Sequence, residues 1–362
     1  MTRPARSAAR HQGGEEMIQR ASKLGAACAA ALVSIAAALG AGSVVAQDKP
    51  VTFRYTTGAP AKTPWVMQAE RFVKDVDEES KSSIKVDLFI AAQLGNEQDT
   101  VQQIARGRID MGGFSTGAVA LLVPELALFQ LPLYFKSIAE LDCTLDTALS
   151  KPVTELLAKK GVQFLGWTEV GTVDIVGKKP FLSPKDISGL KAAANSNKVN
   201  AMFWQALGAN PSFIGITEIT SAFQTGLTDV NAAVITFYVP SGLSKVANVL
   251  TRLDLWDAPG LIVMNKAAFD RMSKDQQAAL MRAVQRRPAS QLRTEIRGFE
   301  DVLRGMHEKA GGTIVKATPE QRNEFRKVME AAWPKMVKEV GGDSERFFQT
   351  MEAGRKACEG KS

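Results

Sequence analysis

The chain has 362 residues, of which 45% are hydrophobic and 23% charged, and its formal net charge at neutral pH is +7. This composition is that of a globular protein with room for two domains, and it excludes a disordered or fibrous chain. Basic residues are interspersed with acidic ones, as in segment 74–81, so the positive charge does not indicate nucleic-acid binding.

The first 46 residues are predicted to be a cleaved secretory signal peptide. Arg20 and Lys23 precede an Ala-rich apolar run over 24–45, which ends in small residues suited to cleavage. A start at Met17 would give a leader of ordinary length. The alternative is an uncleaved membrane anchor, which the weak hydrophobicity of an Ala-rich run disfavours. We therefore expect a periplasmic protein.

Removal of this leader leaves two cysteines, Cys143 and Cys358. In an oxidising compartment such a pair tends to form a disulfide, which would tie the C-terminal tail to the first half of the chain. The alternative is two separate thiols, and the sequence leaves both open.

The first half of the mature chain alternates strand, loop and helix. Strands are predicted at 51–55, 84–89 and 109–114, and helices over 65–76 and 97–106. This alternation is typical of an α/β domain, whose binding loops lie at the carboxyl ends of the strands.

A second α/β unit follows. Segment 164–167 is predicted as another strand, 171–177 as a crossing into a second domain, and 260–265 as the return. Two crossings imply a cleft and a hinge. The predicted divisions are domain I at 47–171 plus about 259–310, domain II at 172–258, and C-terminal helices packing on the domains at 311–362.

Helices are predicted towards the C-terminus. The helical pattern over 273–310 has Ser273 as its N-cap, and Pro288 should kink the helix or split it in two. A further helix begins at Pro319, with Thr318 as its cap.

The motifs of common enzymes and metal sites are missing from the sequence. His307 is the one histidine beyond the leader, and we expect it to be exposed on a helix rich in Lys and Glu. No Cys or His spacing suits a metal, and no glycine-rich phosphate loop or G-x-S-x-G is present. We expect neither metal nor cofactor, and an enzyme using carboxylates alone is the third-ranked alternative.

Four blocks, in order, carry a family resemblance. They are Gln93-Leu94-Gly95 followed by Gly107-Arg108-Ile109-Asp110-Met111, Leu131-Pro132-Leu133-Tyr134-Phe135, Gly189-Leu190-Lys191-Ala192-Ala193, and Ala222-Phe223-Gln224-Thr225-Gly226. Together they resemble the DctP-like solute-binding proteins of TRAP transporters, over nearly the whole mature chain.

The resemblance implies two α/β domains joined by hinge strands, with a long helix spanning both. It also implies a binding protein rather than an enzyme, which closes over a ligand and delivers it to a sodium-driven permease with a small and a large membrane subunit. Members of this family are monomers or occasional dimers, and we expect a monomer.

The ligand contacts of the family can be carried over residue by residue. Two arginines that would hold a carboxylate are replaced, by Val173 and Ala193, and Ala233 replaces an often polar residue. The other matching positions are Thr57, Asn96, Ser115, Asn195, Asn197 and Ile216. Cleft loops also contain aromatic residues and one acid, which are Trp65, Phe114, Trp167, Phe237 and Glu169.

Neither Ala nor Val can replace a guanidinium as a carboxylate partner. Either another cation supplies the charge, with Lys178, Lys191 and Lys198 as candidates, or the ligand is not a simple monocarboxylate. Aromatic rings with one acid would suit an amine, and the same rings would suit a neutral or aromatic compound.

A functional alternative is a periplasmic ligand-sensing or scaffold subunit of a signalling system. Neighbouring permease genes would favour transport, whereas a neighbouring kinase gene would favour sensing.

Overall fold

The computed structural model describes residues 49–194 and 197–360. The predicted signal peptide and Asn195 lie outside the described residues. No helix within the described ranges is long and apolar enough to cross a membrane.

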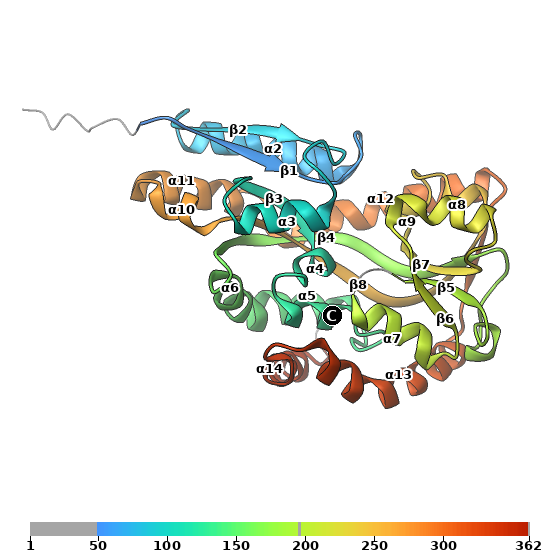
Figure 1. The fold of residues 1–362 in the computed structure, drawn as a ribbon. Helices are drawn as coiled ribbons and strands as arrows, with labels where there is room; N and C mark the ends of the chain where they lie inside the picture. Colours follow the sequence, from blue (N-terminus) through green and yellow to red (C-terminus); the bar gives the residue numbers. More distant parts are fainter. Residues whose placement is uncertain (1–48, 195–196, 361–362) are drawn as a thin grey trace, which may run out of the picture. The chain divides into compact units, whose positions relative to one another are not determined.

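The described chain is built on one mixed sheet with helices on both sides (Figure 1). The strand order is β2-β1-β3-β8-β4-β7-β5-β6, and β9 pairs with β8. The strands are β1 Val51–Thr56, β2 Ile84–Phe89, β3 Met111–Ser115, β4 Val162–Gly177, β5 Lys191–Ala194, β6 Asn210–Phe213, β7 Val230–Val234, β8 Val249–Asn265 and β9 Thr313–Lys316.

The helices occur mostly between strands, as the alternating pattern predicts. The α-helices are α2 Pro64–Glu79, α3 Glu97–Ala105, α4 Thr116–Val119, α5 Ile138–Thr144, α6 Ser150–Ala158, α7 Lys198–Ala206, α8 Ile219–Gln224, α9 Ile235–Tyr238, α10 Lys266–Arg271, α11 Lys274–Gln285, α12 Ala289–Lys309, α13 Pro319–Val340 and α14 Ser344–Ala357. Shorter helical turns are η1 Pro124–Gln130, η2 Leu145–Leu149, η3 Pro184–Asp186, η4 Ile216–Glu218 and η5 Leu243–Lys245.

Two long strands connect the two groups of shorter strands. The antiparallel pair β4 and β8 lies between parallel β1, β2 and β3 on one side and parallel β5, β6 and β7 on the other. Their pairing shifts register at three places, and such bulges bend a strand pair. We call β1 to β3 with α2 and α3 the first lobe, and β5 to β7 with α7 to α9 the second lobe.

The α/β class predicted from the sequence is confirmed. Both predicted crossings fall in β4 and β8, which are longer than the short apolar runs suggested. Residues Pro50–Ser362 form a single compact unit, so the domain boundaries within it stay predictions.

Three apolar clusters build the core. One lies in the first lobe and includes Phe53, Tyr55 and Phe72, with Leu280 of α11. A second lies in the second lobe around Phe223, and the largest combines residues of α3, α5, α6, α7, α13 and α14 with residues of β4 and β8. The apolar stripe predicted for α2 is therefore the surface that covers the first-lobe sheet.

Pro288 divides the long helical pattern into α11 and α12. Its φ of −62° and extended ψ place it immediately before α12, where a proline ring is tolerated. The predicted split is confirmed, and so are the N-caps at Ser273 and Thr318, each with a capping box. Helix α12 packs on β4, on α2 and on α9, and so contacts both lobes.

The expectation that His307 is exposed was wrong. Its side chain is buried, and its ring lies 5.1 Å from the ring of Tyr238. Burial lowers the pKa of His307, which keeps it neutral in the second-lobe core. The Lys and Glu residues around His307 suggested an exposed position, but they occupy the other face of α12.

Cys143 of α5 and Cys358, immediately after α14, form a disulfide with a Cα to Cα distance of 5.9 Å. The bridge fixes the last helix against the first half of the chain.

Candidate functional site

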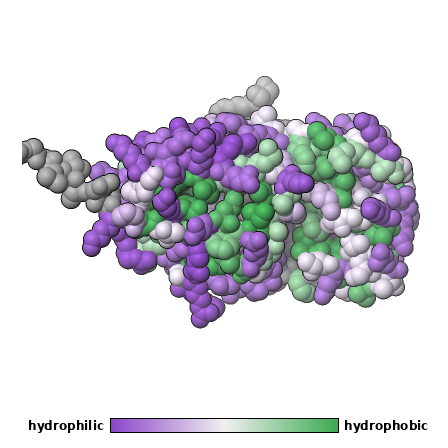
Figure 2. Space-filling model, turned by 90° about the horizontal axis from the view of Figure 1, so that it is seen from above, coloured by the Kyte–Doolittle hydropathy of each residue, from purple (hydrophilic) through white to green (hydrophobic). Residues whose placement is uncertain are grey.

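A cavity of about 590 Å³ opens between the two lobes. This size is in the range of small-molecule sites. Its walls come from the loop after β1, the start of α3, the end of β3 and the middle of β4 and β8, while the second lobe contributes η4, Val234 and Phe237. Seen from above, hydrophobic residues gather in two groups, one over the first lobe and one over α8 and α9 (Figure 2).

Most of the predicted contact residues line this cavity. Those that do are Thr57, Trp65, Asn96, Phe114, Ser115, Trp167, Glu169, Ile216 and Phe237. Four of the predicted positions do not line it, which are Val173, Ala193, Asn197 and Ala233.

Two first-lobe residues keep a free hydrogen-bonding group. The Asn96 Oδ1 atom accepts from the backbone N–H of Asp99 at 2.8 Å and so caps α3. Thr57 Oγ1 accepts from the backbone N–H of Ala59 at 3.2 Å. Within the described residues, the Asn96 amide group and the Thr57 hydroxyl proton have no partner, so both are available to a ligand.

Ser115 is less available than predicted. Its hydroxyl donates to Glu97 at 3.0 Å and accepts from the backbone N–H of Ala118 at 3.1 Å, while its own N–H also donates to Glu97. Burial raises the pKa of Glu97, and the hydrogen bonds from Ser115 oppose that shift. The pair is therefore satisfied before any ligand enters.

The aromatic residues differ in their exposure to the cavity. The Trp65 ring is half-buried, and its Nε1–H donates to the backbone carbonyl of Glu169 at 2.8 Å. Trp167 is almost fully buried between Phe129 and Phe164, and it donates to Ser150. Trp167 is thus mainly a core residue, whereas Trp65 and Phe237 present apolar surface to the cavity.

Glu169 does not offer a free carboxylate, contrary to the reasoning that assigned it to an amine. The Arg297 guanidinium of α12 donates to both of its oxygens, at 3.0 and 2.5 Å. Arg297 also binds both oxygens of Asp142 and one oxygen of Asp257. One cation therefore joins three carboxylates from α5, β4 and β8.

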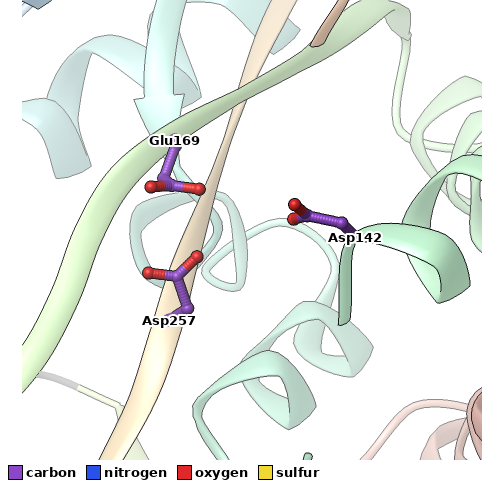
Figure 3. Close-up of side chains that lie close together, drawn as sticks. All are labelled: Asp142, Glu169 and Asp257. Carbon is purple, nitrogen blue, oxygen red and sulfur yellow. The ribbon is translucent and has the colours of Figure 1, made fainter. Parts of the chain in front are cut away.

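Three carboxylates at such short range could in principle hold a metal ion. Asp142, Glu169 and Asp257 point toward one another, with candidate ligand oxygens within 4.8 Å (Figure 3). In this chain the Arg297 hydrogen bonds already use oxygens of all three. The cluster is an ion-pair network, and these side chains do not fit a metal unless Arg297 leaves.

Burial raises the pKa of two carboxyl groups in this region. Desolvation and the neighbouring Asp257 carboxylate raise the pKa of Glu169 to about 9, against the opposing effect of Arg297. Burial raises the pKa of Glu300 to about 7, opposed by a 2.7 Å hydrogen bond from the backbone N–H of Thr172.

Arg287 is the one cation among the described residues that line the cavity, and the sequence did not single it out. It forms an ion pair with Asp75 at 2.9 Å, and Arg286 contacts the same carboxylate. None of the three lysines suggested as substitute cations lines the cavity, and all three are exposed. That suggestion was wrong because these lysines, just after β4, at the start of β5 and at the start of α7, lie on the surface.

The other four predicted residues have structural roles. Val173, Ala193 and Ala233 are buried side chains of β4, β5 and β7. Asn197 caps α7 and donates to the Gln130 side chain at 2.5 Å. An Asn immediately before a helical run is itself an N-cap signal, which could have identified this role.

Comparison with known proteins gives a family match. The profile described as "Bacterial extracellular solute-binding protein, family 7" (DctP) matches residues 55–339, which is more than half of the chain. One similar protein is the 2,3-diketo-L-gulonate-binding periplasmic protein YiaO of Escherichia coli. It is 28% identical over 68% of this chain and 75% of that protein.

Solved structures show the same fold. A TRAP periplasmic solute-binding protein from Roseobacter denitrificans, with bound β-D-glucuronate, has a TM-score of 0.78 at 23% identity. The match covers 84% of this chain and 99% of that one. A second, from Sulfurospirillum deleyianum with bound succinate, has a TM-score of 0.75 at 25% identity, covering 83% and 98%.

Proposed function

Because the chain belongs to the bacterial extracellular solute-binding proteins of family 7, we propose that its cavity binds a small organic solute and delivers it to a membrane permease. The family and its structural neighbours are substrate-binding receptors and not enzymes. The proposed location is the periplasm, and the proposed partners are the small and large subunits of a TRAP permease.

The state of the charged groups in the cavity supports an uncharged solute. The ionisable side chains among the described lining residues are Asp75, Glu97, Glu169 and Arg287. Each already has a partner, as Asp75 pairs with Arg287, Glu97 with Ser115 and Glu169 with Arg297. A charged ligand would be buried without a free counter-ion, which is heavily penalised.

This proposal sets the chain apart from the solved relatives, which hold glucuronate and succinate. The two positions where the family resemblance places arginines carry buried Val173 and Ala193. An amine is also disfavoured, because the Glu169 carboxylate that would hold it is bound by Arg297. A neutral molecule, aliphatic or aromatic, therefore fits best.

A thermal-shift screen of the protein purified from the periplasm tests the proposal. The panel contains acids, amines, polyols, aliphatic alcohols and neutral aromatics. A neutral compound at a hundredfold excess over its Kd should stabilise the protein by about 2.7 kcal/mol, which raises Tm by roughly 5 °C.

A cavity-blocking variant and its control make the screen specific. Gly58 lines the cavity, and a Cβ added there meets nothing within 4 Å, so Gly58→Tyr should fold and abolish the shift. Gly305 of α12 is equally open and lies outside the cavity, so Gly305→Tyr should retain the shift. A shift with carboxylates alone would contradict the uncharged solute, and turnover of any compound would contradict a receptor.

A further inference from the structure

The cavity extends beyond the cleft into the interior of the first lobe. Part of its lining lies between the sheet and the helices α2 and α11. This inner compartment is lined by Tyr55, Ala69, Phe72, Gly113, Gly166 and Val284. Ligand contacts carried over from the family positions lie in the cleft loops, so the inner compartment is additional space.

Glycines of β3 and β4 let neighbouring side chains lie close to the sheet in this compartment. A Cβ on Gly113 would lie 2.6 Å from the Tyr55 hydroxyl, and one on Gly166 would lie 3.0 Å from Cγ1 of Val284. Glycine at both positions leaves room for the Tyr55 hydroxyl beside β3 and for Val284 beside β4, and a larger residue would displace them.

Of the described residues that line the inner compartment, Tyr55 alone has a polar side chain. Tyr55 is 4% exposed, and its ring packs against Phe72 with 5.9 Å between centroids. Within the described residues its hydroxyl has no hydrogen-bond partner, although it lines the cavity. Burial raises the pKa of Tyr55, so the hydroxyl stays protonated and can donate. Because Tyr55 lines the cavity, a ligand acceptor that reaches the inner compartment can take this hydrogen bond.

Within the described residues, the polar side chains between the cleft and the inner compartment already have hydrogen-bond partners. Trp65 donates to the backbone of Glu169, and Gln68 donates to the carbonyl of Leu292 and accepts from Thr168 at 3.2 Å. These bonds hold α2 against β4 and α12 and use the polar atoms of the passage. What remains for a ligand is apolar surface.

We infer that the solute is an elongated, uncharged molecule with a polar group at each end and an apolar middle. One end binds near Asn96 and Thr57 in the cleft, the middle lies between Trp65 and Phe72, and the far end accepts a hydrogen bond from Tyr55. This inference rests on the proposed function and specifies the solute class of the same site.

Calorimetric titration of the periplasmic protein with α,ω-diols, from butane-1,4-diol to decane-1,10-diol, tests the inference. Affinity should rise about fourfold per added methylene as the middle becomes buried. Tyr55→Phe should weaken the longest diols about fivefold and leave 1-alkanols of equal length unchanged, because those lack the second hydroxyl.

A variant that fills the inner compartment tests whether the longer diols gain their affinity there. Ala69→Leu places bulk in the inner compartment and should remove the dependence on chain length while butane-1,4-diol binds as before. Met67→Leu, on the exposed side of the same helix, is the matched control and should change nothing. If diol affinity in Ala69→Leu still depends on chain length as in the unmodified protein, or if no diol binds, the proposed role of the inner compartment is wrong. Hits elsewhere in the thermal-shift panel would still support the proposed function.

Discussion

At the scale of single residues, Arg297 determines what the centre of the protein can bind. It lies on α12 and joins Asp142, Glu169 and Asp257, which are far from it and from one another in the sequence. A carboxylate that faces a cleft is a candidate ligand group until its counter-ion is known. The guanidinium changes Glu169 from a ligand contact to a structural one.

Glu300 makes the stability of the fold depend on pH. It is 2% exposed, and its pKa is raised from the usual 4.5 to about 7 by burial. Between these values the folded protein keeps a proton that the unfolded chain releases, so stability falls as pH rises through this window. Asp174, raised to about 7 by burial and by Asp254, acts in the same direction.

Urea unfolding at several pH values from 4.5 to 8 measures this effect. Glu300→Gln retains the acceptor for the Thr172 N–H and removes the titration, so the pH slope should decrease. The loss should approach about 1.4 kcal/mol per pH unit at most, which corresponds to one proton. Asp301→Asn, 78% exposed on the neighbouring position, should leave the slope unchanged. An unaltered slope in Glu300→Gln would refute the assignment.

At the scale of elements, the disulfide holds α14 on α5. The two cysteines are 215 residues apart, so the bridge closes a very long loop in the unfolded chain. Helix α14 also contributes Phe347 and Met351 to the largest apolar cluster. Both contributions should be lost in part when the helix is released.

Removal of the bridge in the variant with Cys143→Ser and Cys358→Ser should therefore destabilise the protein by about 2 to 5 kcal/mol. Urea unfolding compares this variant with the oxidised protein, and dithiothreitol should have no effect on the variant. Ligand binding should persist, because neither cysteine lines the cavity. A destabilisation below about 0.5 kcal/mol would show that packing alone fixes α14.

At the scale of the whole molecule, local patterns predicted the elements well. Alternation identified β1 and β2, a 3.6-residue stripe identified α2, and capping signals placed the starts of α11 and α13. These features depend on neighbouring residues, which a sequence displays directly.

The site could be predicted only in part, because its chemistry depends on contacts between distant segments. The loops that form the cavity were found from their places after strands. The pairing of Glu169 with Arg297 spans 128 residues, and the Tyr55 hydroxyl lies against Gly113 of another strand. No spacing in the sequence reports such contacts.

The central claim is that this cavity takes an uncharged solute, and one matched pair tests it most directly. Decane-1,10-diol and decanedioate have the same length and differ in the charge of their ends. Calorimetric titration of the purified protein should show saturable binding of the diol. Affinity for the dicarboxylate should be weaker by at least about a hundredfold, because the described lining residues offer its charges no free counter-ion. Equal or tighter binding of decanedioate would contradict the account.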